Sequence, residues 1–159
     1  AYGSAKCWLP ERFSSVAKKL IEHDPSYVVV FVGDLSHKPL LSSICAKLPK
    51  RVINLAGQTT LRELVALTKI CSAFLTNDSG PMHIASSLGI PLIALFGSTD
   101  PVVTGPYQKK EGVVQKKVPC APCFLRECPI DFPCMKKIGV DEVFNAILSI
   151  MEQEQLVLR

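Results

Sequence analysis

The 159-residue sequence contains no apolar run approaching the roughly 20 residues that a membrane-spanning helix needs. Aromatic residues make up only 7% of the chain and no basic stripe is interleaved with them, which argues against a base-stacking surface for nucleic acid. The first residues, AYGSAKCWLP, contain no apolar export segment and no initiator Met, so we expect a piece of a longer protein. Hydrophobic residues account for 48%, which predicts a globular domain, and the net charge of +4 suits an anionic ligand.

Helical and strand patterns alternate along the chain. Continuous β-branched and aromatic runs at 27–32 and 92–96 are typical of strands buried on both faces. Further strands are predicted at 51–55 and 73–76, with an edge strand at 112–117. Helices are predicted at 10–23, 38–48, 60–70, 81–88 and 141–156, the third with a capping box of Thr60 and Glu63. This order predicts an α/β fold with a doubly wound, Rossmann-like parallel sheet, whose ligand binds at the carboxyl ends of the strands.

The segment 75–101, LTNDSGPMHIASSLGIPLIALFGSTDP, carries the strongest functional signal. It reads as a strand, a tight turn, a helix, a second strand and a Gly-containing loop. Helix N-termini attract anions because their first amides are unpaired and their dipole end is positive. Ser79 and Gly80 are therefore candidate phosphate or diphosphate ligands, although Asp and Ser are also ordinary helix caps. His83 is either a phosphate donor or a plain surface residue.

Seven cysteines are many for a chain of this length. Cys7, Cys45 and Cys71 stand among apolar residues, and we expect buried free thiols there. Cys120, Cys123, Cys128 and Cys134 cluster in a Pro-rich segment at 119–138 that is predicted to be irregular. Their spacing is compatible with a structural zinc site, with disulfides or with free thiols.

At NDSGPMHIASSLGIPLIALFGSTDP the sequence resembles the lipopolysaccharide heptosyltransferases of glycosyltransferase family 9. Three further stretches share the resemblance, namely YGSAKCWLPERFSSVAKKL, INLAGQTTLRELVALTKICSAFLTNDSG and CAPCFLRECPIDFPCMKKI. The last is similar to an insert of heptosyltransferase II-like members. The resemblance implies the C-terminal, donor-binding half of a two-domain GT-B enzyme, as a single domain over 1–159. It also implies transfer of heptose from ADP-heptose, with inversion, to the lipid A inner core.

The resemblance implies that the acceptor site and an acidic catalytic base belong to an N-terminal half, so the 159 residues alone should be inactive. It assigns Lys6 to the diphosphate, with Ser4 as a weaker hydroxyl donor. Asp78 is expected to contact sugar hydroxyls or to cap the helix, and Thr99 and Asp100 to touch the donor or to form an ordinary turn. Asp34 is the only acid in GDLSHKPL, where the family often places a ribose ligand.

No cofactor is required if these groups stabilise the leaving diphosphate. The implied setting is the cytoplasm, with peripheral association at the inner membrane allowed, and no nucleic-acid partner. Two other functions remain open at this stage, another GT-B sugar-nucleotide enzyme such as an epimerase, and a zinc-dependent interaction module built on the Cys segment. A phospho-acceptor receiver domain is excluded, because the acidic pair and the Lys that it requires are missing.

Overall fold

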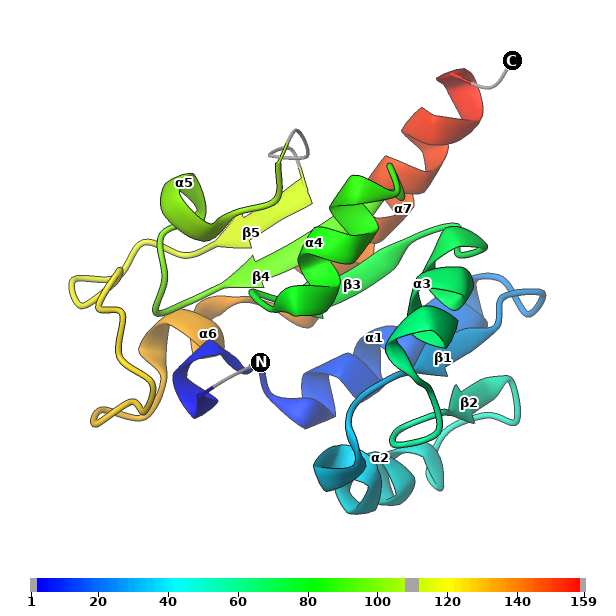
Figure 1. Ribbon diagram of the computed structural model, residues 1–159, viewed down its shortest axis with the longest axis horizontal. Helices are drawn as coiled ribbons and strands as arrows, with labels where there is room; N and C mark the ends of the chain where they lie inside the picture. Colours follow the sequence, from blue (N-terminus) through cyan, green and yellow to red (C-terminus); the bar gives the residue numbers. More distant parts are fainter. Residues whose placement is uncertain (1–2, 108–111, 158–159) are drawn as a thin grey trace. The chain divides into compact units, whose positions relative to one another are not determined.

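The computed structural model describes residues 3–107 and 112–157, which divide into two compact units (Figure 1). One unit contains Pro10–Leu67, and the other contains Ala1–Leu9 with Thr68–Arg159. Each unit has a parallel sheet with flanking helices, as the α/β prediction requires. Paired strands occur as two sheets, β1–β2 and β3–β4–β5, where the sequence predicted one.

The unit of residues 10–67 is built on a two-stranded sheet. Its elements are α1 (Pro10–His23), β1 (Val29–Phe31), the 3-10 turn η2 (Leu35–His37), α2 (Lys38–Cys45), β2 (Val52–Asn54) and most of α3 (Leu61–Lys69). Val29 pairs with Val52 and Phe31 with Asn54. The apolar face of α1 is buried at Val16, Ala17 and Ile21, as its helical spacing predicts. The expectation that β1 is buried on both faces is wrong, because its residues are only half-buried in this two-stranded sheet.

The N-terminus of α3 has the predicted capping box. The Glu63 carboxylate accepts hydrogen bonds from the Thr60 amide at 2.7 Å and from the Thr60 hydroxyl at 2.8 Å. In return, the Glu63 amide donates to Thr60 Oγ1 at 3.3 Å. These reciprocal bonds satisfy amides that the helix itself leaves unpaired.

The other unit contains the three-stranded sheet, in the order β3–β4–β5 with β5 at the edge. Its strands are β3 (Phe74–Asn77), β4 (Leu92–Phe96) and β5 (Val113–Gln115). Its helices are the 3-10 turn η1 (Ser4–Lys6), α4 (Gly80–Ser87), α5 (Pro101–Thr104), α6 (Pro133–Lys137) and α7 (Val140–Val157). Gly89 follows α4 with a φ of 72°, the left-handed conformation expected of a Gly that ends a helix.

The core of this unit forms around β4, whose five residues are all buried. Because side chains alternate along a strand, Leu92, Ala94 and Phe96 share one face, and they cluster there with Met82 and Ala85 of α4. The opposite face of the sheet is covered by α7, whose Val143 and Ile147 are buried (Figure 1). The sheet is therefore fixed on both faces and holds the ends of β3 and β4 in place.

The Cys-rich segment is more ordered than predicted. It includes the short helix α6, and Asp131 and Phe132 before it have φ values of 65° and 54°. Cys7, Cys45 and Cys71 form no disulfide, as expected, but the expectation that they are buried is wrong, since all three are only half-buried. Desolvation nevertheless raises the pKa of Cys45 and of Cys71. Within the described residues we find no helix with the length and apolarity that a membrane crossing demands.

Candidate donor-binding site

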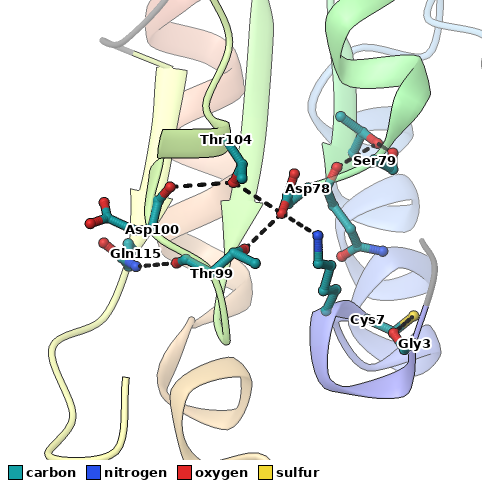
Figure 2. Close-up of polar contacts among 11 residues, drawn as sticks. Gly3, Cys7, Asp78, Ser79, Thr99, Asp100, Thr104 and Gln115 are labelled. Atoms are coloured by element: carbon teal, nitrogen blue, oxygen red, sulfur yellow. Dashed lines mark hydrogen bonds and ion pairs between the residues drawn. The ribbon is translucent and has the colours of Figure 1, made fainter. Parts of the chain in front are cut away.

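The carboxylate of Asp78 is the centre of a hydrogen-bonded group at the carboxyl end of β3 (Figure 2). Its Oδ2 accepts from Lys6 Nζ at 2.7 Å, from Thr99 Oγ1 at 2.7 Å and from Thr104 Oγ1 at 3.3 Å. The Asp78 side chain is only 5% exposed, whereas that of Lys6 is 27% exposed. A buried carboxylate needs such donors, because burial without them costs several kcal/mol.

Backbone pairing places Asp78 at this position. Asn77 pairs with Leu95 in the parallel ladder, and the Asp78 amide donates to the Leu95 carbonyl at 3.1 Å. The N-terminal segment is fastened beside it, because the Trp8 amide donates to Asn77 Oδ1 at 2.9 Å. The Trp8 indole is buried and donates to the Ile138 carbonyl at 3.2 Å. The buried Trp8, two residues after Lys6, therefore holds the Lys6 side chain close to Asp78.

The loop after β4 supplies the hydroxyl donors. Thr99 is buried, and its carbonyl accepts from Gln115 Nε2 at 3.0 Å, which ties the loop to β5. A Cβ added at Gly97 would lie 3.0 Å from Cys134 Sγ and 2.9 Å from a Met135 carbon, so a side chain there would require the side chains of α6 to shift. The sequence predicted that Thr99 touches the donor or belongs to an ordinary turn. In the structure its hydroxyl donates to the Asp78 carboxylate.

The turn between β3 and α4 carries the predicted phosphate residues. Ser79 is the N-cap residue of α4, yet its hydroxyl makes no cap bond and lies 3.0 Å from Thr76 Oγ1. Pro81 has no N–H, and the Met82 amide donates to the Ser79 carbonyl at 3.0 Å. Within the described residues, Gly80 therefore offers the first-turn amide that is not committed to the backbone of α4. A Cβ at Gly80 would meet nothing within 4 Å.

His83 and Ser4 are exposed. His83 lies within the first turns of α4, and Ser4 opens η1, where its carbonyl accepts from the Cys7 amide at 3.0 Å. The Asp100 carboxylate accepts a hydrogen bond from the Val102 amide at 2.8 Å and so caps α5. This contact is local, as expected of a residue in a turn. Asp34 belongs to the other unit, where its carboxylate caps η2 and contacts the His37 ring at 2.8 Å. The Ser36 hydroxyl and then the His37 ring lower the pKa of Asp34.

The four clustered cysteines are all free thiols. Cys134 is buried, and Cys128 Sγ accepts from the Phe132 amide at 3.1 Å. Burial raises the pKa of Cys134, and the neighbouring Cys120 and Cys128 raise it further. In the part of the chain that the structure describes, no three His, Cys, Asp or Glu side chains are arranged to hold a metal ion.

Two contacts at the site were not predicted. Thr104 and Gln115 carry no motif, and their roles depend on a loop path that only the folded chain shows. The alternative that Asp78 caps α4 is wrong, because Ser79 occupies the N-cap position and the Asp78 carboxylate bonds to side chains.

Comparisons with known proteins agree with the resemblance seen in the sequence. Residues 1–132 match glycosyltransferase family 9 (heptosyltransferase). The lipooligosaccharide heptosyltransferase 2 of Campylobacter jejuni is 30% identical over 162 residues, which cover 98% of this chain and 50% of the relative. The lipopolysaccharide heptosyltransferase 2 of Escherichia coli is 38% identical over 118 residues, covering 72% of this chain and 33% of the relative.

Among solved structures, the E. coli ADP-heptose lps heptosyltransferase II is similar with a TM-score of 0.81 and 29% identity. The similarity covers 97% of this chain and 44% of that chain. The chain thus spans half or less of the length of these relatives. All three are transferases, which favours that class over the epimerase and the zinc-dependent interaction module.

Proposed function

The chain belongs to glycosyltransferase family 9, and we propose that it is the donor-binding half of a heptosyltransferase that uses ADP-heptose. The whole enzyme would transfer heptose to the inner core of lipopolysaccharide, on an acceptor site and with an acidic base supplied by an N-terminal half. The observation that carries the proposal is the meeting of Asp78, Ser79 and Gly80 with Lys6 and Thr99 at the carboxyl ends of β3 and β4. In open α/β sheets this edge is where nucleotides bind.

The first turn of α4 is the proposed diphosphate site. The Gly80 amide lies at the N-terminus of α4, where the helix dipole favours negative charge. Because Gly80 has no side chain, an anion can approach its backbone closely. The exposed imidazole of His83 and the hydroxyls of Ser79 and Ser4 are the proposed side-chain donors, with Lys6 as the cation. These residues would stabilise the charge that gathers on the diphosphate as the glycosidic bond breaks.

Lys6 is already paired with Asp78, and this limits what it offers. An ammonium group has three N–H donors, so a phosphate oxygen can be bound while one N–H stays on Asp78. The pair is close to neutral overall, and its attraction for an anion is therefore weaker than that of an unpaired lysine. The pairing also holds the ammonium in one place, which lowers the entropic cost of binding.

The proposed chemistry requires no metal, since Gly80, His83 and Lys6 would take the role that a cation plays elsewhere. The proposed setting is the cytoplasm, at the inner face of the inner membrane. A structural zinc ion at the Cys segment is a subsidiary proposal, which the described residues support weakly because no three of their His, Cys, Asp or Glu side chains are arranged to hold a metal ion. Metal analysis of protein prepared under reducing conditions tests it, and less than a tenth of an equivalent of zinc would reject it.

Transfer of heptose by the complete enzyme tests the function directly. With ADP-heptose and a lipid A inner-core acceptor, we expect product from the complete enzyme and none from these 159 residues alone. Turnover by the 159-residue chain would contradict the division of labour between halves. Absence of product from the complete enzyme, with the donor demonstrably bound, would show that the sugar acceptor has been misassigned.

A further inference from the structure

Thr104 reaches the site from outside every motif in the sequence. Its hydroxyl lies 3.3 Å from Asp78 Oδ2 and also 3.3 Å from the Asp100 carbonyl, at the start of its own helix (Figure 2). A hydroxyl has one hydrogen to donate, so the two acceptors share it. Thr104 thereby links the carboxyl end of β3 to the short helix α5.

The helix α5 is held firmly for an element of four residues. Asp100 caps it, Pro101 presets the backbone of its first turn, and the Thr104 amide donates to the Asp100 carbonyl at 2.9 Å. A Cβ at Gly105 would lie 2.1 Å from the Pro101 carbonyl oxygen, so only Gly lets the chain leave the helix there. Because Val102 and Val103 are 81% and 71% exposed, α5 adds little to the core. Its inward contribution is the Thr104 hydroxyl.

The hydrogen bonds of Asp78 are unequally divided between its two oxygens. Lys6, Thr99 and Thr104 all donate to Oδ2. Within the described residues, no side chain donates to Oδ1, and the one buried polar side-chain atom without a partner is Ser98 Oγ. Oδ1 is therefore accessible to solvent, and its lone pairs are available to a hydroxyl group of a ligand.

We propose that Thr104 is a positioning residue, which acts with Thr99 to fix the Asp78 carboxylate so that Oδ1 accepts a hydrogen bond from a sugar hydroxyl of the donor. This inference rests on the proposed function and specifies which part of the donor the group recognises. Two hydroxyls and one ammonium approach Oδ2 from different elements, which leaves the carboxylate little freedom to rotate. A carboxylate repels a diphosphate but accepts readily from hydroxyls, so its target is the sugar.

Binding of ADP and of ADP-heptose by the complete enzyme separates this role from a structural one. Calorimetry without acceptor would compare the unsubstituted enzyme with Thr104→Val, Thr104→Ser and, on the same helix, Val103→Ala. We expect Thr104→Val to weaken ADP-heptose binding about three- to tenfold, the value of one hydrogen bond, and ADP binding less than twofold. Thr104→Ser restores the hydroxyl and should restore affinity, and Val103→Ala should change neither ligand.

If Thr104→Val weakens the binding of ADP and of ADP-heptose equally, or weakens neither, the inference is overturned. The proposed function still stands in that case, provided that the unsubstituted enzyme binds ADP-heptose. If the unsubstituted enzyme binds no ADP-heptose, the proposed function is wrong and the role of Thr104 falls with it. If Thr104→Val does not fold, Thr104→Ala replaces it in the same experiment. It should likewise weaken ADP-heptose binding and leave ADP binding nearly unchanged.

Discussion

Lys6 Nζ and Asp78 Oδ2 lie 2.7 Å apart although 72 residues separate them in the chain. One is held by η1 and the buried Trp8, and the other by the pairing of β3 with β4. The pair thus joins the N-terminal segment to the carboxyl end of β3. A partly buried ion pair of this kind leaves a costly unpaired carboxylate when its cation is removed.

Replacing Lys6 by Met should lower the free energy of unfolding by roughly 1–3 kcal/mol, less than for a fully buried pair because Lys6 is 27% exposed. The double variant Lys6→Met/Asp78→Asn should recover part of the loss. Urea titration measures both. Lys18→Met is the control, because its pair with Glu22 is about 60% exposed and should contribute at most about 0.5 kcal/mol. If Lys6→Met and Lys18→Met lower the free energy of unfolding equally, the Lys6–Asp78 pair stabilises the fold no more than an exposed ion pair does.

Gly80→Val should weaken ADP binding at least about tenfold, equal to about 1.4 kcal/mol, because side-chain carbons would stand where the diphosphate approaches. The fold should tolerate the change, since a Cβ at Gly80 meets nothing within 4 Å. Gly139→Val is a matched control, because its Cβ is equally unobstructed. Calorimetry and thermal unfolding measure the two effects. If Gly80→Val binds ADP with unchanged affinity, the phosphate site does not lie at the first turn of α4.

His83→Ala should reduce kcat/KM of the complete enzyme about 10- to 150-fold, the value of a hydrogen bond to a charged group. The exposed imidazole makes no contribution to the core, so Tm should stay constant. Ser87→Ala, at an exposed position on the same helix, is the control. A loss of stability with unchanged kinetics would assign His83 a structural role.

The capping box of α3 should give a pH-dependent contribution to stability. Bonds from the Thr60 amide, then its hydroxyl, lower the pKa of Glu63 below its ordinary 4.5. A lowered pKa in the folded state means that the contribution is complete above pH 4.5 and is lost as pH falls through the folded value. Thr60→Ala should reduce this dependence without abolishing it, because the amide bond at position 60 remains, and should cost about 1 kcal/mol at neutral pH. Urea titrations at several pH values measure it, and a parallel pH profile in the variant would contradict the assignment.

Cys134 should resist alkylation in the folded protein. Burial raises its pKa, so little thiolate is present near pH 8, and the thiolate is the reactive form. Mass spectrometry after treatment with iodoacetamide should find Cys134 modified much more slowly in native than in unfolded protein. Equal rates in the two states would show that the Cys segment opens freely around α6.

The sequence predicts the local elements well where one signal dominates. The bounds of α1 and β4 follow from helical spacing and from a continuous apolar run, and Glu63 lies at the capping distance from Thr60. The division of strands into two sheets was not predictable, since pairing depends on distant segments. Likewise, a Gly-Ser-Thr-Asp-Pro stretch reads as a turn, and the helix-start signal of Asp100 before Pro101 is too short to distinguish a four-residue helix from it.

The predicted residues of the site fall into two groups for a physical reason. Ser79 and Gly80 follow from local geometry, because a helix begins where the turn ends. The partners of Asp78 do not, since Thr104 lies 26 residues away and reaches it only through the path of α5. Pairing of Lys6 with Asp78 also depends on the anchoring of Trp8, which no spacing rule describes.

Nucleotide preference tests the central claim most directly. Calorimetric titration of the protein with ADP, UDP and GDP under identical conditions should give binding for ADP at one site, with UDP and GDP at least about tenfold weaker, a difference of about 1.4 kcal/mol. The affinity for ADP should fall at least about tenfold in Gly80→Val and stay unchanged in Gly139→Val. Equal affinity for the three nucleotides, or tighter binding of UDP, would contradict an ADP-heptose donor site at the start of α4.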